Sequence, residues 1–466
     1  MNPYIQYMYS YPHKTAYQPL TGVALEDYLP ALAGSGHGLY LHIPFCQTKC
    51  GYCNLFSVTG QDSAAMDRYL DAVERQAKQY GALLAPFRTE FSSLTIGGGT
   101  PLLLSENQIR RMFAVLEDCF SFAAGRELVI ETAPNQTTEG KLRLLKSSGA
   151  TRISMGIQSF SDQELETLRR SHRADRARQA LALLTSCDFP CINVDFIYGI
   201  PGQTVQSLLS SLKEALTFEP DELFLYPLYV KHGAKLEREP GEGVVLEPEA
   251  ALAQYQAASA FLREQGFRQD SMRRFLRQKG QRVYSECGFG TSLALGCGGR
   301  SYLGNLHFST PYAITRTGCL AQLAEYEATR DFTGISHGLL LSAQEQKRRY
   351  VIRHLLIQPG LSLDKYQEHF HSQAETDFPL LGQWLEEGYL ERRKGADAEA
   401  GADGPGYQPD SGRPGAQGPK ARSGVPDVQG YLSLTPAGMA LSDYLGPQLV
   451  SPQICQYMKE WEASHG

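Results

Sequence analysis

The chain has 466 residues, of which 42% are hydrophobic and 20% are charged, a composition that is ordinary for a globular protein. The length allows two or three domains, or one large α/β domain with appendages. Lys and Arg number 44 against 50 Asp and Glu, and the resulting formal net charge of −6 argues against nucleic acid or a membrane surface as partner.

The sequence also bears on the compartment. No apolar run approaches the length of a membrane-spanning helix, so we predict no membrane span. The N-terminus, MNPYIQYMYSYPHKTAYQPL, lacks the basic and apolar segments of a signal peptide. We therefore expect a cytoplasmic protein, in which the ten cysteines are thiols or metal ligands rather than disulfides.

Secondary-structure patterns begin after an N-terminal arm. Residues 1–36 are rich in Tyr, Pro and Gly and show no clear period. From residue 37, short apolar runs typical of strands alternate with longer amphipathic stretches typical of helices. The runs that predict strands are GLYLHI (38–43), SSLTIG (92–97), ELVIET (127–132), RISMGIQ (152–158), CINVDFIYG (191–199) and ELFLYPL (222–228). The clearest helical stretches are residues 66–84, 105–120 and 206–218.

This alternation predicts an α/β fold. Strands interleaved with helices imply right-handed βαβ units and therefore a parallel sheet. Eight such units would close a barrel, so six units over residues 37–235 predict a partial, TIM-like (βα)6 barrel. Ser105 and Ser161 are expected to cap helices, because Gln108 and Glu164 follow each of them by three residues. The functional edge should lie at the C-terminal ends of the strands.

The rest of the chain predicts an extension and a second, smaller domain. We expect residues 236–340 to extend the barrel, with a helix at 247–266 and a glycine-rich stretch at 288–305 that could wrap the open side of the sheet. Residues 341–450 show three helices and a strand pair, as in a winged-helix unit, followed by a tail at 451–466. Between the two wing strands, residues 395–429 are rich in Gly, Pro, Ala and Asp and are predicted to be disordered.

Three cysteines crowd into the stretch CQTKCGYC at residues 46–53. Chance clustering is improbable, and the expected compartment disfavours a disulfide. A zinc site is one interpretation, with His42 as a fourth ligand. An iron–sulfur cluster is the other, and three thiolates would leave one iron open to bind and activate another molecule.

The flanking motifs favour the cluster. YLHIPFC with its C-x3-C-x2-C spacing resembles the radical S-adenosylmethionine (SAM) enzymes, and IGGGTP, IQSF and DFIYGIPGQT resemble the group that contains oxygen-independent coproporphyrinogen III oxidase and the haem chaperone HemW. The resemblance implies that Cys46, Cys50 and Cys53 hold a [4Fe–4S] cluster whose open iron binds SAM. Reductive cleavage of SAM would then give a 5′-deoxyadenosyl radical.

The resemblance also implies residues that contact SAM. Tyr40, at the end of the first predicted strand, and Tyr52, before the last cysteine, would lie against the cofactor; packing is the alternative for both. The loop that would hold the SAM amino group consists of Gly97, Gly98, Gly99, Thr100 and Pro101, although tight turns use the same residues. Glu131, at the end of the third strand, would bond the SAM ribose.

Three further residues match a second SAM site of the oxidase. They are Gln158 at the end of the fourth strand, Arg170 near the end of a helix, and Asp195 inside an apolar strand. For Arg170 the structural alternative is a favourable charge at a helix C-terminus. For Asp195 it is a buried partner, because an unpaired carboxylate in an apolar strand would be costly.

The chain departs from both relatives. Leu55 stands where the oxidase has a further cysteine, and residues 282–287 (RVYSEC) lack the His and Trp of the stretch thought to hold haem in the chaperone. An auxiliary cluster at Cys287 and Cys297 is a minor alternative to buried thiols.

Three functions follow as hypotheses. The first is a radical SAM oxidoreductase for a small-molecule substrate such as a porphyrinogen, with a flavodoxin- or ferredoxin-type electron donor. The second is a haem-binding delivery protein on the same scaffold. The third, a nucleic-acid-binding module, rests only on the winged-helix-like pattern and conflicts with the acidic charge.

Overall fold

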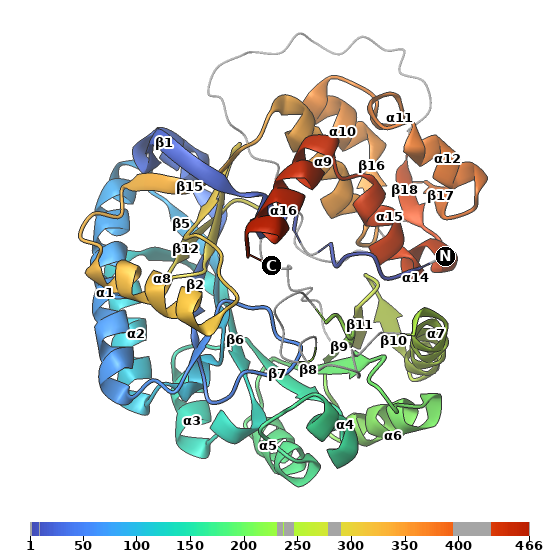
Figure 1. The fold of residues 1–466 in the computed structure, drawn as a ribbon, viewed down its shortest axis with the longest axis horizontal. Coiled ribbons are helices and arrows are strands. Elements are labelled where there is room, and N and C mark those ends of the chain that lie inside the picture. Colours follow the sequence, from blue (N-terminus) through green and yellow to red (C-terminus); the bar gives the residue numbers. More distant parts are fainter. Residues whose placement is uncertain are drawn as a thin grey trace.

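The computed structural model describes residues 2–8, 10–230, 236, 247–277, 290–394 and 430–465. A large curved sheet surrounded by helices forms one part of the molecule, and a smaller helical unit with its own short sheet lies beside it (Figure 1). Among the described helices, none is both long and apolar enough to cross a membrane.

The six predicted strands form the centre of the large sheet. They occur in chain order, each parallel to the next, as the βαβ pattern predicts. Their bounds are β2 (Ser35–Ile43), β5 (Glu90–Gly98), β6 (Ser121–Thr132), β7 (Arg152–Gln158), β8 (Cys191–Tyr198) and β9 (Glu222–Pro227). A seventh parallel strand, β12 (Ser292–Leu295), pairs with β2 and comes from the predicted glycine-rich stretch.

Helices cover the outer side of this sheet (Figure 1). They are α1 (Ser63–Leu84), α2 (Glu106–Cys119), α3 (Glu139–Ser147), α4 (Asp162–Thr167), α5 (Ala174–Ser186), α6 (Val205–Leu216) and α7 (Pro248–Glu264), with 3-10 turns η3 (Ala85–Phe87), η4 (Pro101–Leu103) and η5 (Pro134–Gln136). Ser105 forms the predicted capping box with Gln108. Ser161 also caps its helix, but the Glu164 side chain accepts instead from three other side chains and does not close a box.

Antiparallel strands extend the sheet at both edges. Beyond β9 lie β11 (Arg274–Arg277) and β10 (Phe267–Gln269). Beyond β12 lie β13 (Arg300–Leu303), β14 (Leu306–Ser309), β15 (Gly334–Leu340) and β1 (Gln18–Ala24), with α8 (Arg316–Ala328) between β14 and β15 in the chain. The predicted extension over 236–340 thus adds strands to both ends of one 13-stranded sheet.

The N-terminal arm is more structured than its sequence indicates. Besides β1, it contains η1 (Lys14–Ala16) and η2 (Leu25–Leu32). The partner of β1 is β15, more than 300 residues away, so no local pattern could reveal this pairing.

The C-terminal unit matches the winged-helix-like prediction. Its short sheet has the order β16-β18-β17, and helices pack around it. In chain order its elements are α9 (Ala343–Leu355), β16 (Leu361–Ser362), α10 (Leu363–Phe370), α11 (Ala374–Asp377), α12 (Leu380–Glu386), β17 (Leu390–Arg393), β18 (Tyr431–Leu434), α14 (Pro436–Ala440), α15 (Ser442–Gln448) and α16 (Pro452–His465). The wing strands β17 and β18 pair antiparallel, and the insertion between them, 395–429, lies outside the described residues.

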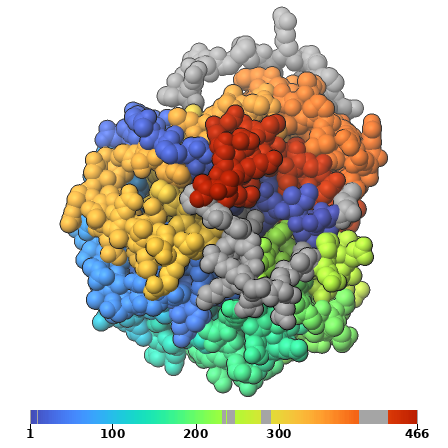
Figure 2. Space-filling model, viewed as in Figure 1, coloured from blue at the N-terminus to red at the C-terminus, as the bar shows by residue number. Residues whose placement is uncertain are grey.

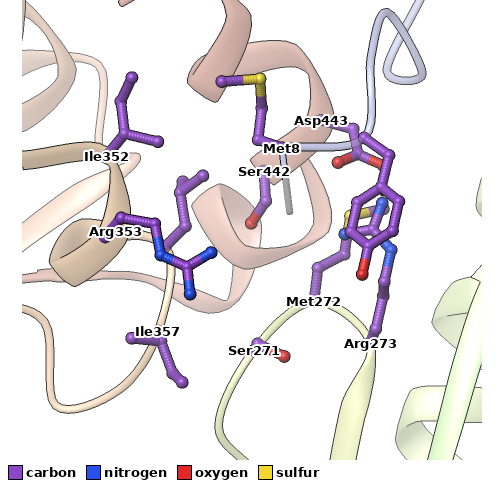
Figure 3. A pocket seen from close by; sticks show the side chains of 11 residues that line it. Met8, Ser271, Met272, Arg273, Ile352, Arg353, Ile357, Ser442 and Asp443 are labelled. Atoms are coloured by element: carbon purple, nitrogen blue, oxygen red, sulfur yellow. The ribbon is translucent and has the colours of Figure 1, made fainter. Parts of the chain in front are cut away.

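The first residues of the chain join the two parts. This segment runs between the large sheet and the C-terminal unit (Figures 1 and 2). The backbone N–H groups of Ile5 and Gln6 donate to the carbonyl of Asp443, whose side chain forms a buried ion pair with Arg273. A small pocket lies at this junction, with Met8 and Arg353 among its lining side chains (Figure 3). It shares no residue with the cysteine stretch.

Candidate functional site

The three clustered cysteines lie in a loop at the C-terminal end of β2. This cysteine loop, residues 44–58, is closed at its base because β3 (Phe45–Cys46) pairs with β4 (Val58–Thr59). None of the three cysteines forms a disulfide. Burial, followed by the neighbouring thiols of Cys53 and Cys50, raises the pKa of the Cys46 thiol to about 12. The three thiols are thus close enough to interact electrostatically.

The donor set fits a cluster better than a mononuclear zinc ion. Within the described ranges, no three His, Cys, Asp or Glu side chains are placed to hold a single ion. The proposed fourth zinc ligand, His42, has both ring nitrogens engaged, Nε2 with the Phe56 carbonyl at 2.9 Å and Nδ1 with the Tyr40 hydroxyl at 3.1 Å. In an iron–sulfur cluster each thiolate binds its own iron, so the sulfurs need not converge on one point.

The glycine loop after β5 packs directly against the cysteine loop. A Cβ on Gly97 would lie 2.8 Å from the Glu131 carboxyl group, and one on Gly98 would lie 2.6 Å from the His42 ring. A Cβ on Gly99 would lie 2.6 Å from the Phe45 carbonyl oxygen and 3.0 Å from Cys46 Sγ. Each glycine therefore makes room for a different neighbour.

Hydrogen bonds tie the two loops together. Gly99 N–H donates to the Ile43 carbonyl and Thr100 N–H to the Phe45 carbonyl, both at 2.8 Å. Gly98 N–H donates to Glu131 Oε2 at 3.0 Å. These N–H groups are already engaged, and an amino group that donates needs acceptors, so carbonyl or hydroxyl oxygens of the loop would have to bind the amino group of SAM.

Tyr40 and His42 lie on one face of β2, since side chains two residues apart in a strand share a face. His42 Nε2 faces a carbonyl, so it must carry the proton, and Nδ1 accepts from the Tyr40 hydroxyl. Burial lowers the pKa of His42 to about 4, which keeps the ring neutral. His42 therefore fixes the direction of the Tyr40 hydroxyl, a role that sequence reasoning missed although the spacing of the two residues pointed to it.

Two half-buried carboxylic acids, Glu131 on β6 and Asp195 on β8, lie near the C-terminal part of the sheet strands. Burial raises the pKa of Glu131 to about 7, and the Gly98 N–H partly offsets this rise. Burial likewise raises the pKa of Asp195 to about 6. Asp195 has the partner that its apolar strand required, because Asn193 Nδ2 donates to Asp195 Oδ1 at 2.8 Å.

Gln158 ends β7, and Arg170, which follows α4, reaches both this strand and the cysteine loop. The strand has an irregular register between Gly156 and Gln158, and Gln158 adopts a positive φ of 73°. Arg170 lies beyond the last residue of α4 and donates to Cys50 Sγ at 3.1 Å and to the Gly156 carbonyl at 2.6 Å. Its Nε is buried and finds no acceptor among the described residues, a state that it shares with the Nε of Arg75 and of Arg273.

Tyr52 packs as its structural alternative predicts, whereas its contact with SAM stays a prediction. It packs against an apolar cluster that includes Leu168, Ile197 and Leu228, and it forms a side-chain hydrogen bond with Arg170. The structure therefore places Arg170 beside Cys50 and Tyr52, although more than a hundred residues separate it from both in the sequence.

The cysteine loop is also held by residues from both ends of the chain. Lys14 Nζ and the Tyr312 hydroxyl both donate to the Asn54 carbonyl, at 3.2 and 2.5 Å. Lys14 lies 3.7 Å from the centre of the Tyr312 ring, and that ring stacks on Trp461 of α16. No local motif marks these contacts, so sequence reasoning missed them.

The second cysteine pair gains no support as an auxiliary cluster. Cys287 lies outside the described residues. Cys297 is buried, its pKa is raised by burial, and its Sγ lies 3.7 Å from the Thr310 hydroxyl. The haem-related segment 282–287 also lies outside the described part of the chain.

Comparison with known proteins assigns the class of this site. Residues 40–215 match the sequence profile of the Radical SAM superfamily, so the chain contains a radical SAM domain. The cofactors of such a domain are a [4Fe–4S] cluster and SAM, as the cysteine loop predicts.

The relatives of the chain include haem chaperones and coproporphyrinogen oxidases, which confirms the resemblance found in the sequence. The chain is 33% identical over 247 residues to the haem chaperone HemW of Mycobacterium tuberculosis, covering 51% of this chain but only 63% of the chaperone. It is 27% identical over 415 residues to the oxygen-independent coproporphyrinogen III oxidase of Escherichia coli K12, covering 83% of this chain and 88% of the oxidase. The crystal structure of the E. coli oxidase HemN has the same fold, with a TM-score of 0.75, 23% identity, and coverage of 96% of this chain and 97% of HemN.

Proposed function

We propose that this chain is a radical SAM oxidoreductase that acts on a tetrapyrrole-like substrate such as a porphyrinogen. The observation that carries the proposal is the seating of the cysteine loop on the glycine loop, where Gly99 leaves room for Cys46 Sγ and for no added side chain. The similarity to coproporphyrinogen oxidases over more than four fifths of both chains supports the substrate class.

In this proposal the three thiolates of Cys46, Cys50 and Cys53 hold the cluster. When bound and reduced, the cluster supplies one electron that splits SAM into methionine and a 5′-deoxyadenosyl radical, which removes a hydrogen atom from the substrate. A flavodoxin- or ferredoxin-type protein would supply that electron in the cytoplasm.

The chain's own residues bind and orient SAM. Carbonyl oxygens of Gly98 and Gly99, with the Thr100 hydroxyl beside Cys46, accept from its amino group. Glu131 accepts from ribose hydroxyls or donates to them, because its raised pKa lies near neutrality. Tyr40, whose hydroxyl direction is fixed by His42, lies along the same face.

The remaining polar residues would contact the adenosyl part or a second SAM. Gln158 presents its amide from the irregular end of β7, and Asp195 presents the carboxylate oxygen that Asn193 does not occupy. Arg170 Nε donates to a ligand acceptor, and Tyr52 excludes water from one side of the cysteine loop.

Anaerobic reconstitution tests the proposal. The protein should bind iron and sulfide in equal amounts and, with dithionite and SAM, release 5′-deoxyadenosine. Incubation with coproporphyrinogen III should convert its propionate side chains, as seen by mass spectrometry. Cys50→Ala should abolish cluster absorbance, whereas Cys187→Ala, a half-buried thiol on the outer helix layer, should not. Zinc in place of iron, or iron without sulfide, would refute the proposal.

A haem-delivery protein on the same scaffold is the second candidate. The similarity to HemW supports it, and so does Leu55, an exposed leucine at the position where the oxidase has a further cysteine. Haem titration distinguishes the two functions. A saturable Soret shift with one haem per chain, without substrate-dependent 5′-deoxyadenosine, would favour delivery over oxidation.

A further inference from the structure

Arg170 makes the shortest of the described side-chain hydrogen bonds to the three thiol sulfurs. Its Nη1 lies 3.1 Å from Cys50 Sγ, whereas the Thr100 hydroxyl lies 3.8 Å from Cys46 Sγ. The guanidinium group is always charged and only donates. A bond from such a donor to a thiolate is charge-assisted and stronger than a bond from a neutral hydroxyl.

We propose that Arg170 is a positioning residue for the cluster's electron transfer: by donating to Cys50 Sγ it raises the reduction potential of a cluster that this thiolate holds. The inference rests on the proposed function, since it requires a cluster in the cysteine loop. It gives Arg170 a role in cluster reduction that is separate from any contact of its Nε with SAM.

The backbone around Arg170 holds its guanidinium in place. Arg169 adopts a φ of +54°, and Arg170 N–H donates to the Leu165 carbonyl at 2.9 Å, so the chain turns back toward the sheet just after α4. His172 Nε2 bonds the Ile157 carbonyl at 3.1 Å, which fastens the following residues to β7. Backbone and side-chain bonds on both sides of Arg170 thus hold this turn against the sheet.

The side chain itself is anchored to the same strand. Arg170 Nη2 donates to the Gly156 carbonyl at 2.6 Å, while Nη1 reaches Cys50. A Cβ on residue 156 would lie 3.6 Å from Nη2 and 2.7 Å from the Gln158 amide, so glycine leaves space for both side chains. Because the bond from Nη2 fixes the planar guanidinium group, Nη1 has little freedom to move away from the sulfur.

The surroundings strengthen the interaction. Tyr52 bonds the guanidinium group, and behind it lie apolar residues such as Leu168 and Ile197. In such a setting charges are screened less than in water. The bond between Arg170 and Cys50 should therefore influence the energy of an added electron more than a solvent-exposed arginine would.

The direction of the effect follows from charge. Reduction takes one electron from the flavodoxin- or ferredoxin-type donor and adds one negative charge to the cluster and its thiolates. A cation and an N–H bond at a ligand sulfur stabilise that charge, and both hydrogen bonds to sulfur and net charge set cluster potentials. Removing Arg170 should make the cluster harder to reduce.

The test is a redox titration of the reconstituted protein without SAM, followed by electron paramagnetic resonance. Arg170→Gln should lower the equilibrium constant for reduction about tenfold, which is about 59 mV for a one-electron couple. Arg169→Gln removes an exposed charge one residue away and should leave the potential unchanged. Arg170→Lys keeps the charge but loses the fork, and its potential should fall between those of the wild type and Arg170→Gln.

The outcomes separate this inference from the proposed function. If the wild type binds no iron and sulfide, the proposed function fails. If the wild type holds a cluster and Arg170→Gln has the same potential, only the role of Arg170 is overturned. If Arg170→Gln does not retain a cluster, Arg170→Lys decides: a potential below the wild type supports the inference, and an equal potential overturns it.

Discussion

Replacing Gly98 with alanine would place a methyl group against a ring that cannot move away. The added Cβ would lie 2.6 Å from His42 Cε1 and within 2.8 Å of both ring nitrogens. Two hydrogen bonds, to Tyr40 and to the Phe56 carbonyl, hold that ring. The backbone at Gly98 also has a φ of +114°, which side-chain-bearing residues rarely adopt.

The loss of folding stability in Gly98→Ala has two parts, backbone strain and overpacking, which a control variant can separate. The backbone conformation costs an alanine about 1–3 kcal/mol. The overpacking against His42 costs about 1–3 kcal/mol more, and loss of unfolded-state freedom returns about 0.4–1 kcal/mol. Gly98→Ala should therefore destabilise the fold by about 1–6 kcal/mol. Gly149→Ala has a φ of +82° but no atom within 4 Å of the added Cβ, so it should show the backbone cost alone.

The assay is urea unfolding of the cofactor-free protein under reducing conditions. A double-mutant cycle with His42→Ala isolates the steric part, because the truncated side chain gives the new methyl group space. The double variant should be more stable than the sum of the single effects by about 1 kcal/mol or more. Equal destabilisation by Gly98→Ala and Gly149→Ala, together with additive effects in the cycle, would refute the steric reasoning.

Three further predictions concern groups around the same site. Burial raises the pKa of Glu131 from 4.5 to about 7, so the protonated form of Glu131 stabilises the fold. This stabilisation is full below about pH 4.5 and is lost as the pH rises to 7. Glu131→Gln cannot titrate, so the urea midpoint of its unfolding should depend less on pH over this range. Glu164→Gln should cost about 2 kcal/mol in urea unfolding, since the buried carboxylate accepts from Ser159 and Gln203; an unchanged midpoint would contradict this. Lys14→Met removes a hydrogen-bond donor to the cysteine loop and should speed the loss of iron to a chelator. An unaltered rate of iron loss would argue that the bond from Lys14 to the Asn54 carbonyl does not hold the loop in place.

Local patterns were sufficient for the centre of the fold. The six parallel strands follow from β-branched and apolar runs between amphipathic stretches, and the Ser105 cap follows from residues three apart. The added strand β1 could not be found in this way, because it pairs with β15, more than 300 residues later in the chain. Glu164 shows the same limit: its spacing predicts a bond back to the helix cap, but distant polar groups from the loops after β7 and β8 compete for the carboxylate.

The candidate site shows why its glycine motif is contiguous. A flexible turn needs one or two glycines, yet here three successive positions each face a different group: the carboxyl group of Glu131, the ring of His42, and the Phe45 carbonyl with the Cys46 sulfur. The sequence predicted a loop that approaches a ligand, but the spatial neighbours that leave no room for a side chain lie 34 to 56 positions away. Alanine at each of the three positions should therefore move a different partner. At 97 it would displace the Glu131 carboxylate, at 98 the His42 ring and with it the Tyr40 hydroxyl, and at 99 the cluster ligand Cys46. A loop that served only as a tight turn would show one common defect at all three positions.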